Sequence, residues 1–203
     1  MNLPLIPVDE FAREFLILRG KAIQKYAELE HSLGSLYAFL MGVPPEIAGI
    51  TFFKIQNTRS RTAILDKLLK RKCGNTYNVF WNPLGKLLGE LDQKRNEIVH
   101  WGTIVEIVLG AQDGTQELVL MPSNLWDHKL EPRINGEDLY AFIVKCDFIQ
   151  RSVNVFEAVI SSPRILPDGS TFPVSDAWRD ICLQPITYPP PDTHPLSLNY
   201  SKP

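Results

Sequence analysis

The chain has 203 residues, of which 44% are hydrophobic and 22% are charged, values typical of a globular protein with a packed core rather than of a disordered chain. The formal net charge is −2. This argues against a protein that coats nucleic acid by its overall charge, since such proteins are usually basic, and any contact with RNA must therefore be local.

The three cysteines are far apart, and no CxxC pair or pair of histidines has the spacing of a metal site. The N-terminus lacks the basic and then apolar pattern of a signal peptide. No apolar run reaches the roughly 18 residues that a membrane helix needs. We therefore expect a cytoplasmic protein that contacts no membrane and needs neither a metal nor another cofactor.

Apolar residues that recur at steps of three and four predict four helices. The first spans residues 9–41 and ends before Gly42 and a Pro-Pro pair. The second runs from an N-cap at Thr51 to residue 72. The third starts at Asn82-Pro83 and ends before Gly102, and the last covers residues 136–161.

Between the third and fourth helices the pattern changes to runs of Val, Ile and Leu on either side of Gln-Asp-Gly, which predicts a β-hairpin at about residues 103–121. Residues 163–203 hold nine of the sixteen prolines and predict an extended tail. We expect a mainly α protein: an antiparallel up-and-down four-helix bundle over residues 1–162, with the hairpin inserted before its last helix.

The residues most informative about function lie at the end of the third predicted helix, where Arg95-Asn96 is followed by His100. Here the chain resembles the HEPN family, whose signature is an arginine, usually followed by a polar residue, and a histidine four to six residues further on. In that family the motif lies near a helix end inside a four-helix bundle, and the likeness in helical layout covers about residues 9–161. The resemblance implies an endoribonuclease that needs no metal.

Helical spacing places Arg95 on the apolar stripe of its helix, four residues after Leu91. A guanidinium at such a position is costly unless it is paired or faces a cleft. Asn96 and His100 share another face, which is small and polar further back along the helix, at Gly85 and Gly89. A second helix or a substrate could approach that face closely. A simpler interpretation stays open, in which His100 caps the helix and Arg95 extends past Leu91 to solvent.

These residue types suit RNA cleavage because a ribonucleotide carries its own nucleophile, the 2′-hydroxyl. His100 can transfer a proton, Arg95 can bind the phosphate oxygens, and Asn96 can orient the phosphate or the histidine. One motif supplies a single histidine. HEPN proteins usually bring two motifs together in a dimer, so the resemblance implies a homodimer here. It also allows a role in toxin–antitoxin systems, antiviral defence or RNA processing, and in the first case an inhibitor (antitoxin) protein as partner.

Further candidates lie outside the motif. Several HEPN proteins have an acidic residue on the first helix that packs toward the arginine, and Glu30 resembles it. Residues 51–72 hold seven basic residues and one acid, a local excess suited to RNA. The cations of residues 67–72 are also explained by the dipole of a helix C-terminus. Arg59 and Arg61 are not, and they are the better RNA-binding candidates, with Lys54 as a further one.

Two rival interpretations of the whole chain remain. In one, a HEPN-like bundle has lost its activity and serves as a binding or dimerisation module. In the other, the chain is a helical scaffold without a nucleic-acid role, and Arg95 is buried in an ion pair with Glu28 or Glu30.

Overall fold

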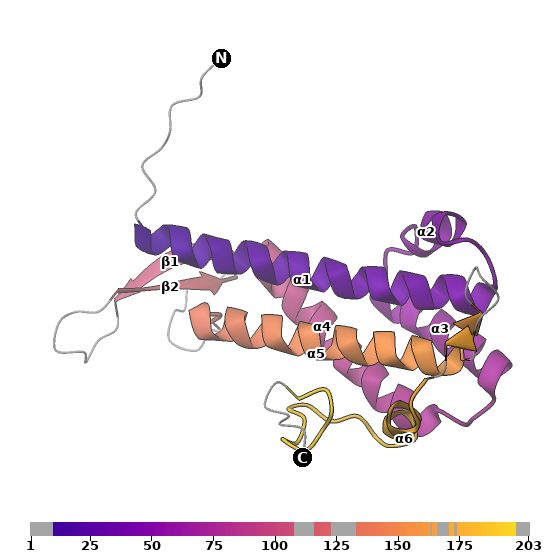
Figure 1. The fold of residues 1–203 in the computed structure, drawn as a ribbon. Helices are drawn as coiled ribbons and strands as arrows, with labels where there is room; N and C mark the ends of the chain where they lie inside the picture. Colours follow the sequence, from indigo (N-terminus) through magenta and orange to yellow (C-terminus); the bar gives the residue numbers. More distant parts are fainter. Residues whose placement is uncertain are drawn as a thin grey trace. The chain divides into compact units, whose positions relative to one another are not determined.

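The computed structural model describes residues 10–107, 116–122, 133–162, 164–165, 171–172 and 174–197, and within them the protein is mainly helical, as predicted (Figure 1). The helices are α1 (Glu10–Met41), α2 (Pro45–Phe52), α3 (Thr58–Cys73), α4 (Asn78–His100), α5 (Gly136–Ile160) and α6 (Asp176–Cys182). The strands are β1 (Gly102–Ile107), β2 (Gln116–Met121), β3 (Arg164–Ile165) and β4 (Thr171–Phe172).

The chain forms two compact units, and each contains parts of α1, α4 and α5. Unit 1 consists of Met1–Tyr26 and Gln93–Val144, and unit 2 consists of Ala27–Asp92 and Lys145–Pro203. Residues 163–203, which the sequence predicts as a tail, fall in unit 2 together with the second half of α5.

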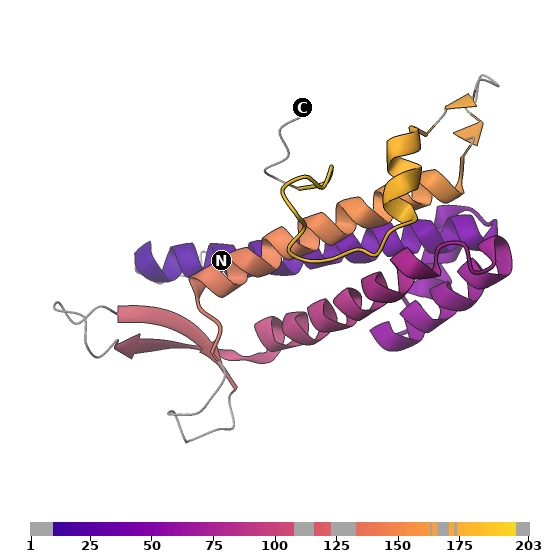
Figure 2. The ribbon, with the colours of Figure 1, turned by 90° about the horizontal axis from the view of Figure 1, so that it is seen from below.

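Unit 1 contains the predicted β-hairpin. β1 and β2 pair antiparallel from Gly102 opposite Met121 to Ile107 opposite Gln116 (Figure 2), and the predicted Gln-Asp-Gly turn lies outside the described residues. Leu120 of β2 also exchanges two backbone hydrogen bonds with Ile134, just before α5. Because both residues are fully buried, this bridge attaches the hairpin to the apolar core of unit 1.

α5 begins and ends within one residue of its predicted limits. Its N-terminus is a reciprocal cap, in which Asn135 Oδ1 accepts from the backbone N–H of Asp138 and Asp138 Oδ2 accepts from that of Asn135, at 2.9 and 3.1 Å. Such a pair satisfies donors that the first turn of a helix leaves free.

In unit 2, the single helix predicted from Thr51 to residue 72 is wrong, because two helices occupy this part of the chain. Pro45 starts α2, and Asn57 caps α3 by accepting a hydrogen bond from the backbone N–H of Ser60 at 3.2 Å. The Thr51 hydroxyl donates to the carbonyl of Ala48 at 2.9 Å within α2, so Thr51 does not cap a following helix. A proline pair can therefore begin a helix as well as prevent one.

The predicted start of the third long helix is also wrong, since α4 begins at Asn78 and contains Pro83. The rings of Phe80 and Trp81 stack on that of Phe156 in α5, with centroids 5.2 and 5.9 Å apart. Both side chains are buried. This packing stabilises the extra first turn, although Pro83, the sixth residue of the helix, cannot donate a backbone hydrogen bond to the carbonyl of residue 79.

The tail is not merely extended, because residues 174–197 include α6 and pack within unit 2. The Phe148 ring of α5 lies 5.8 Å from the Tyr188 ring and 5.6 Å from the His194 ring. Figure 2 shows this segment, in yellow, returning along α5. Burial lowers the pKa of His194, with a further contribution from Arg151.

No single helix among the described residues is long and apolar enough to cross a membrane. Ala12–Met41 and Pro45–Phe52 reach the required length and composition only as a pair, with a bend of 113° between them.

Candidate functional site

Arg95 lies half-buried on α4 with its guanidinium over an aromatic ring of unit 1. Its central carbon is 5.3 Å from the centroid of Tyr26, and Tyr26, only 3% exposed, stacks in turn on Phe142 at 6.4 Å. A cation over an aromatic face gains about 0.5–2 kcal/mol. The tyrosine ring therefore explains how an arginine is accommodated on the apolar stripe of this helix.

The N–H edge of the same guanidinium points toward the polar face of α4. Arg95 Nη1 donates to Oδ1 of the exposed Asn96 at 2.8 Å. No carboxylate and no other acceptor bonds to Arg95 within the described part of the chain. Because a guanidinium carries five N–H donors, most of them remain for an anionic ligand.

His100 is the last residue of α4 and is exposed. Its imidazole has no hydrogen-bond partner among the residues that the structure describes. Asn96 precedes it by one helical turn, so the two side chains lie on one face of α4. The Asn96 amide thus connects the Arg95 guanidinium to the face that carries His100.

The C-terminus of α4 is capped by Arg19, a residue that sequence reasoning missed. Arg19 Nε donates to the carbonyl of Ile98 at 2.9 Å, and Arg19 Nη2 donates to those of Val99 and Trp101 at 3.1 and 3.0 Å. These carbonyls lack partners within the helix, and a cation there also complements the helix dipole. The interpretation of His100 as the capping residue is therefore not supported, because Arg19 takes that role.

The sequence alone gives little indication that Arg19 caps α4. Arg19 lies 79 residues before Ile98 and looks like one more charged residue on a long helix. The one sequence feature that could indicate this role is the position of Arg19 immediately after Leu18, on the edge of the apolar stripe of α1.

Glu30 and Arg61 form a buried ion pair in unit 2, in which Arg61 Nη1 donates to Glu30 Oε1. Arg61 is 9% exposed, donates to the Ile55 carbonyl at 2.6 Å and lies over the Phe52 ring at 5.3 Å. Arg61 was expected to contact RNA, but burial removes it from any ligand in this conformation. Glu30 was expected to pack toward Arg95, yet its carboxylate is bonded to Arg61.

The other basic candidates are accessible. Lys54 is exposed in the segment between α2 and α3, and Arg59 is exposed in the first turn of α3. Both belong to unit 2, whereas Arg95, Asn96 and His100 belong to unit 1.

Burial raises the pKa of Cys182 to about 12 and also raises the pKa of Cys73, so both stay as thiols near neutral pH. No group of three or more His, Cys, Asp or Glu side chains that could hold a metal ion is present in this part of the chain.

No protein-family model matches the chain, and no curated protein or solved structure is similar enough to count as a match. The resemblance to HEPN proteins therefore rests on the sequence motif and the predicted helical layout.

If Arg19 rather than His100 caps α4, Arg19→Ala should lower the free energy of unfolding by about 2 kcal/mol, since hydrogen bonds from a charged group are lost. His100→Ala should change it by less than about 0.5 kcal/mol, as for an exposed side chain without partners. Urea unfolding followed by circular dichroism measures both. A larger loss for His100→Ala than for Arg19→Ala would contradict this assignment of the cap.

Proposed function

We propose that the chain is a metal-independent endoribonuclease of the HEPN type that cleaves RNA by attack of the 2′-hydroxyl. The proposal rests on the contacts and the exposure of the three motif residues. Arg95 is held on Tyr26 with most of its donors unused, Asn96 links it to the face of His100, and the His100 imidazole is exposed.

The proposed reaction uses these groups in the following way. The 2′-oxygen attacks the neighbouring phosphorus as a base removes its proton, and the bond from phosphorus to the 5′-oxygen breaks. A histidine gives the leaving 5′-oxygen its proton. Arg95 stabilises the charge that develops on the phosphorane oxygens. The products are a 2′,3′-cyclic phosphate and a 5′-hydroxyl.

Asn96 has two possible contributions in this scheme. Its Oδ1 fixes the direction of the Arg95 guanidinium, and its amide N–H groups remain to donate to a phosphate oxygen. An exposed asparagine whose oxygen is occupied in this way presents mainly donors, which suits an anionic substrate.

The proposal includes the HEPN-like four-helix arrangement, to which α1, α3, α4 and α5 would contribute, and a cytoplasmic homodimer. A dimer is expected because each chain has one motif histidine, while the reaction needs both a proton acceptor and a proton donor. The biological role would lie in a toxin–antitoxin system, in antiviral defence or in RNA processing, and an inhibitor protein belongs to the first of these.

One observation favours a second candidate, a catalytically inactive HEPN-like module for binding or dimerisation. Catalytic histidines are usually held by a hydrogen bond to one ring nitrogen, and His100 has none among the described residues. In this alternative Arg95 and Asn96 still bind phosphate, but no bond is broken.

Activity of single variants separates the two candidates. Arg95→Ala and His100→Ala should each reduce cleavage of single-stranded RNA by at least about a hundredfold, the usual contribution of one proton-transfer or charge-stabilising group. His31→Ala is the matched control, since His31 is an exposed histidine of α1 in unit 2, and it should cut at the wild-type rate. Circular dichroism verifies folding. RNA binding without cleavage by the wild-type protein would favour the inactive module.

A mixing experiment tests the dimer. If each cleft needs a histidine from both chains, equal amounts of wild-type and His100→Ala protein, exchanged at random, should leave about a quarter of the wild-type activity, since only wild-type pairs are active. If each motif acts without the other chain, about half of the wild-type activity should remain. Light scattering on the same samples should give the mass of a dimer, and a strict monomer would contradict the arrangement.

A further inference from the structure

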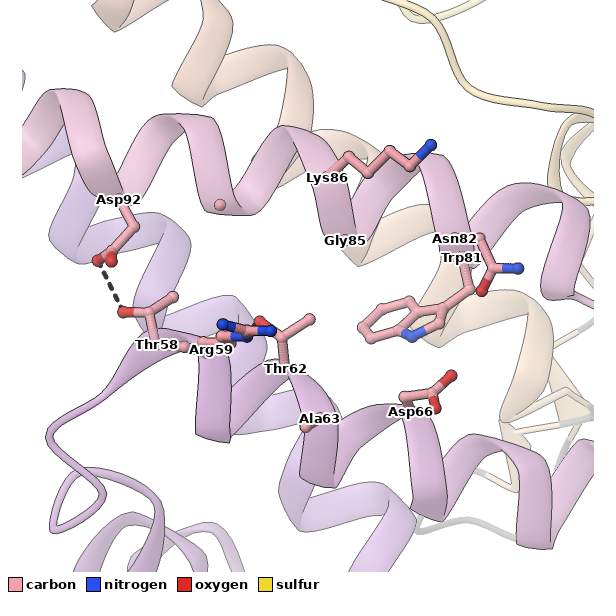
Figure 3. Close-up of a pocket in the computed structure, with 11 residues that line it drawn as sticks. Thr58, Arg59, Thr62, Ala63, Asp66, Trp81, Asn82, Gly85, Lys86 and Asp92 are labelled. Atoms are coloured by element: carbon pink, nitrogen blue, oxygen red, sulfur yellow. Dashed lines mark hydrogen bonds between the residues drawn. The ribbon is translucent and has the colours of Figure 1, made fainter.

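Unit 2 has a pocket between α3 and α4 that the proposed chemistry does not use (Figure 3). Its volume is about 570 Å³, within the range of pockets that hold small ligands. On the α4 side the pocket is lined by Gly85 and Gly89, which have no side chains to fill it. A methyl group added at Gly89 would meet no atom within 4 Å, and one at Gly85 would make an ordinary contact with Thr62 at 3.6 Å.

One wall of the pocket holds the indole N–H of Trp81, which has no acceptor among the described residues. Trp81 as a whole is only 3% exposed. No fully enclosed side-chain nitrogen or oxygen lacks a partner there, so this N–H must reach open space. Figure 3 shows the indole nitrogen facing the gap between the two helices. A ligand that accepts a hydrogen bond would satisfy it.

The charged side chains of the pocket differ in whether the described residues pair with them. Arg59 has no ion pair or hydrogen bond among the described residues, and Figure 3 shows its guanidinium beside Thr62, between the helices. Asp66 is bonded to Lys70 at 2.8 Å, and Asp92 accepts from the Thr58 hydroxyl at 2.7 Å. The unused groups of the pocket are therefore mainly donors.

We propose that this pocket binds a nucleotide through its phosphate ester. The Arg59 fork holds the phosphate, and the nucleoside lies against Trp81 and the glycine floor. Lone inorganic phosphate would contact Arg59 but would not fill the space beside Trp81 and the two glycines. A nucleotide also carries hydroxyl and amino groups, which can donate to the carboxylates of Asp66 and Asp92. The ester can come from a free mononucleotide or from a nucleotide within an RNA chain.

Calorimetric titration with adenosine 5′-monophosphate in phosphate-free buffer tests the proposal. His100→Ala protein is used throughout, so that RNA stays intact and failure of the cleavage mechanism does not affect the result. The mononucleotide should saturate one site per chain. Adenosine and inorganic phosphate should each bind about tenfold more weakly or less, because each lacks half of the contacts.

Two variants locate the site. Arg59→Ala should weaken binding by about tenfold, as expected for loss of a charge-assisted contact, whereas Arg71→Ala, an exposed cation of α3 outside the pocket, should leave it unchanged. Gly89→Leu should abolish binding, because a Cβ at this position meets no atom within 4 Å and the longer side chain would fill the space that the ligand needs. Circular dichroism verifies that it folds.

Absence of saturable binding, or wild-type affinity in both Arg59→Ala and Gly89→Leu, would overturn the proposal. A single-stranded RNA oligonucleotide then identifies the source of the ester. Displacement of the mononucleotide by the oligonucleotide would show that the pocket accepts RNA. Failure to displace it would show that the pocket takes the free nucleotide.

Discussion

The chemistry proposed for the motif depends on how the Arg95 guanidinium is held. A carboxylate partner would neutralise the arginine and occupy the N–H edge that a phosphate needs. The Tyr26 ring instead stabilises the guanidinium as a cation over its face, and among the described residues the N–H groups of Arg95 bond to Asn96 alone. The buried stack of Phe142 and Tyr26 fixes the position of this platform within unit 1. An arginine held in this way is positioned before any substrate arrives.

Three arginines of this chain show how partners decide what a guanidinium can do. Arg61 bonds to Glu30 and to a backbone carbonyl and is buried, so it stabilises unit 2. Arg19 gives its donors to three carbonyls and to the Thr103 hydroxyl, so it ends a helix. Arg95 gives up one donor. Only the last combines a fixed position with unused binding capacity, which is why the proposed chemistry rests on it.

The sequence was informative where local patterns decide the structure. The long apolar stripes predicted α1 and α5 closely, and β-branched residues around a turn predicted the hairpin. The sequence patterns did not predict the features that depend on packing between distant segments. The stacking of Phe80 and Trp81 on Phe156 moved the start of α4. Pro45 at the start of α2 and the Asn57 cap of α3 gave two helices where one was expected. Arg61 and Arg59 are two residues apart and equally basic, so only the fold could distinguish a buried ion pair from a pocket cation.

The central claim is that RNA supplies the nucleophile while Arg95 and His100 assist, and one substrate tests this most directly. It is an RNA oligonucleotide with a preferred cleavage site, made once with ribose and once with a single 2′-deoxy sugar at that site. Cleavage of the first should leave a 2′,3′-cyclic phosphate and a 5′-hydroxyl, as mass spectrometry can verify, and should continue in the presence of EDTA. The second should stay intact at that position because the attacking hydroxyl is gone. Cleavage of the deoxy substrate at a comparable rate, or a 5′-phosphate on the products, would contradict the account.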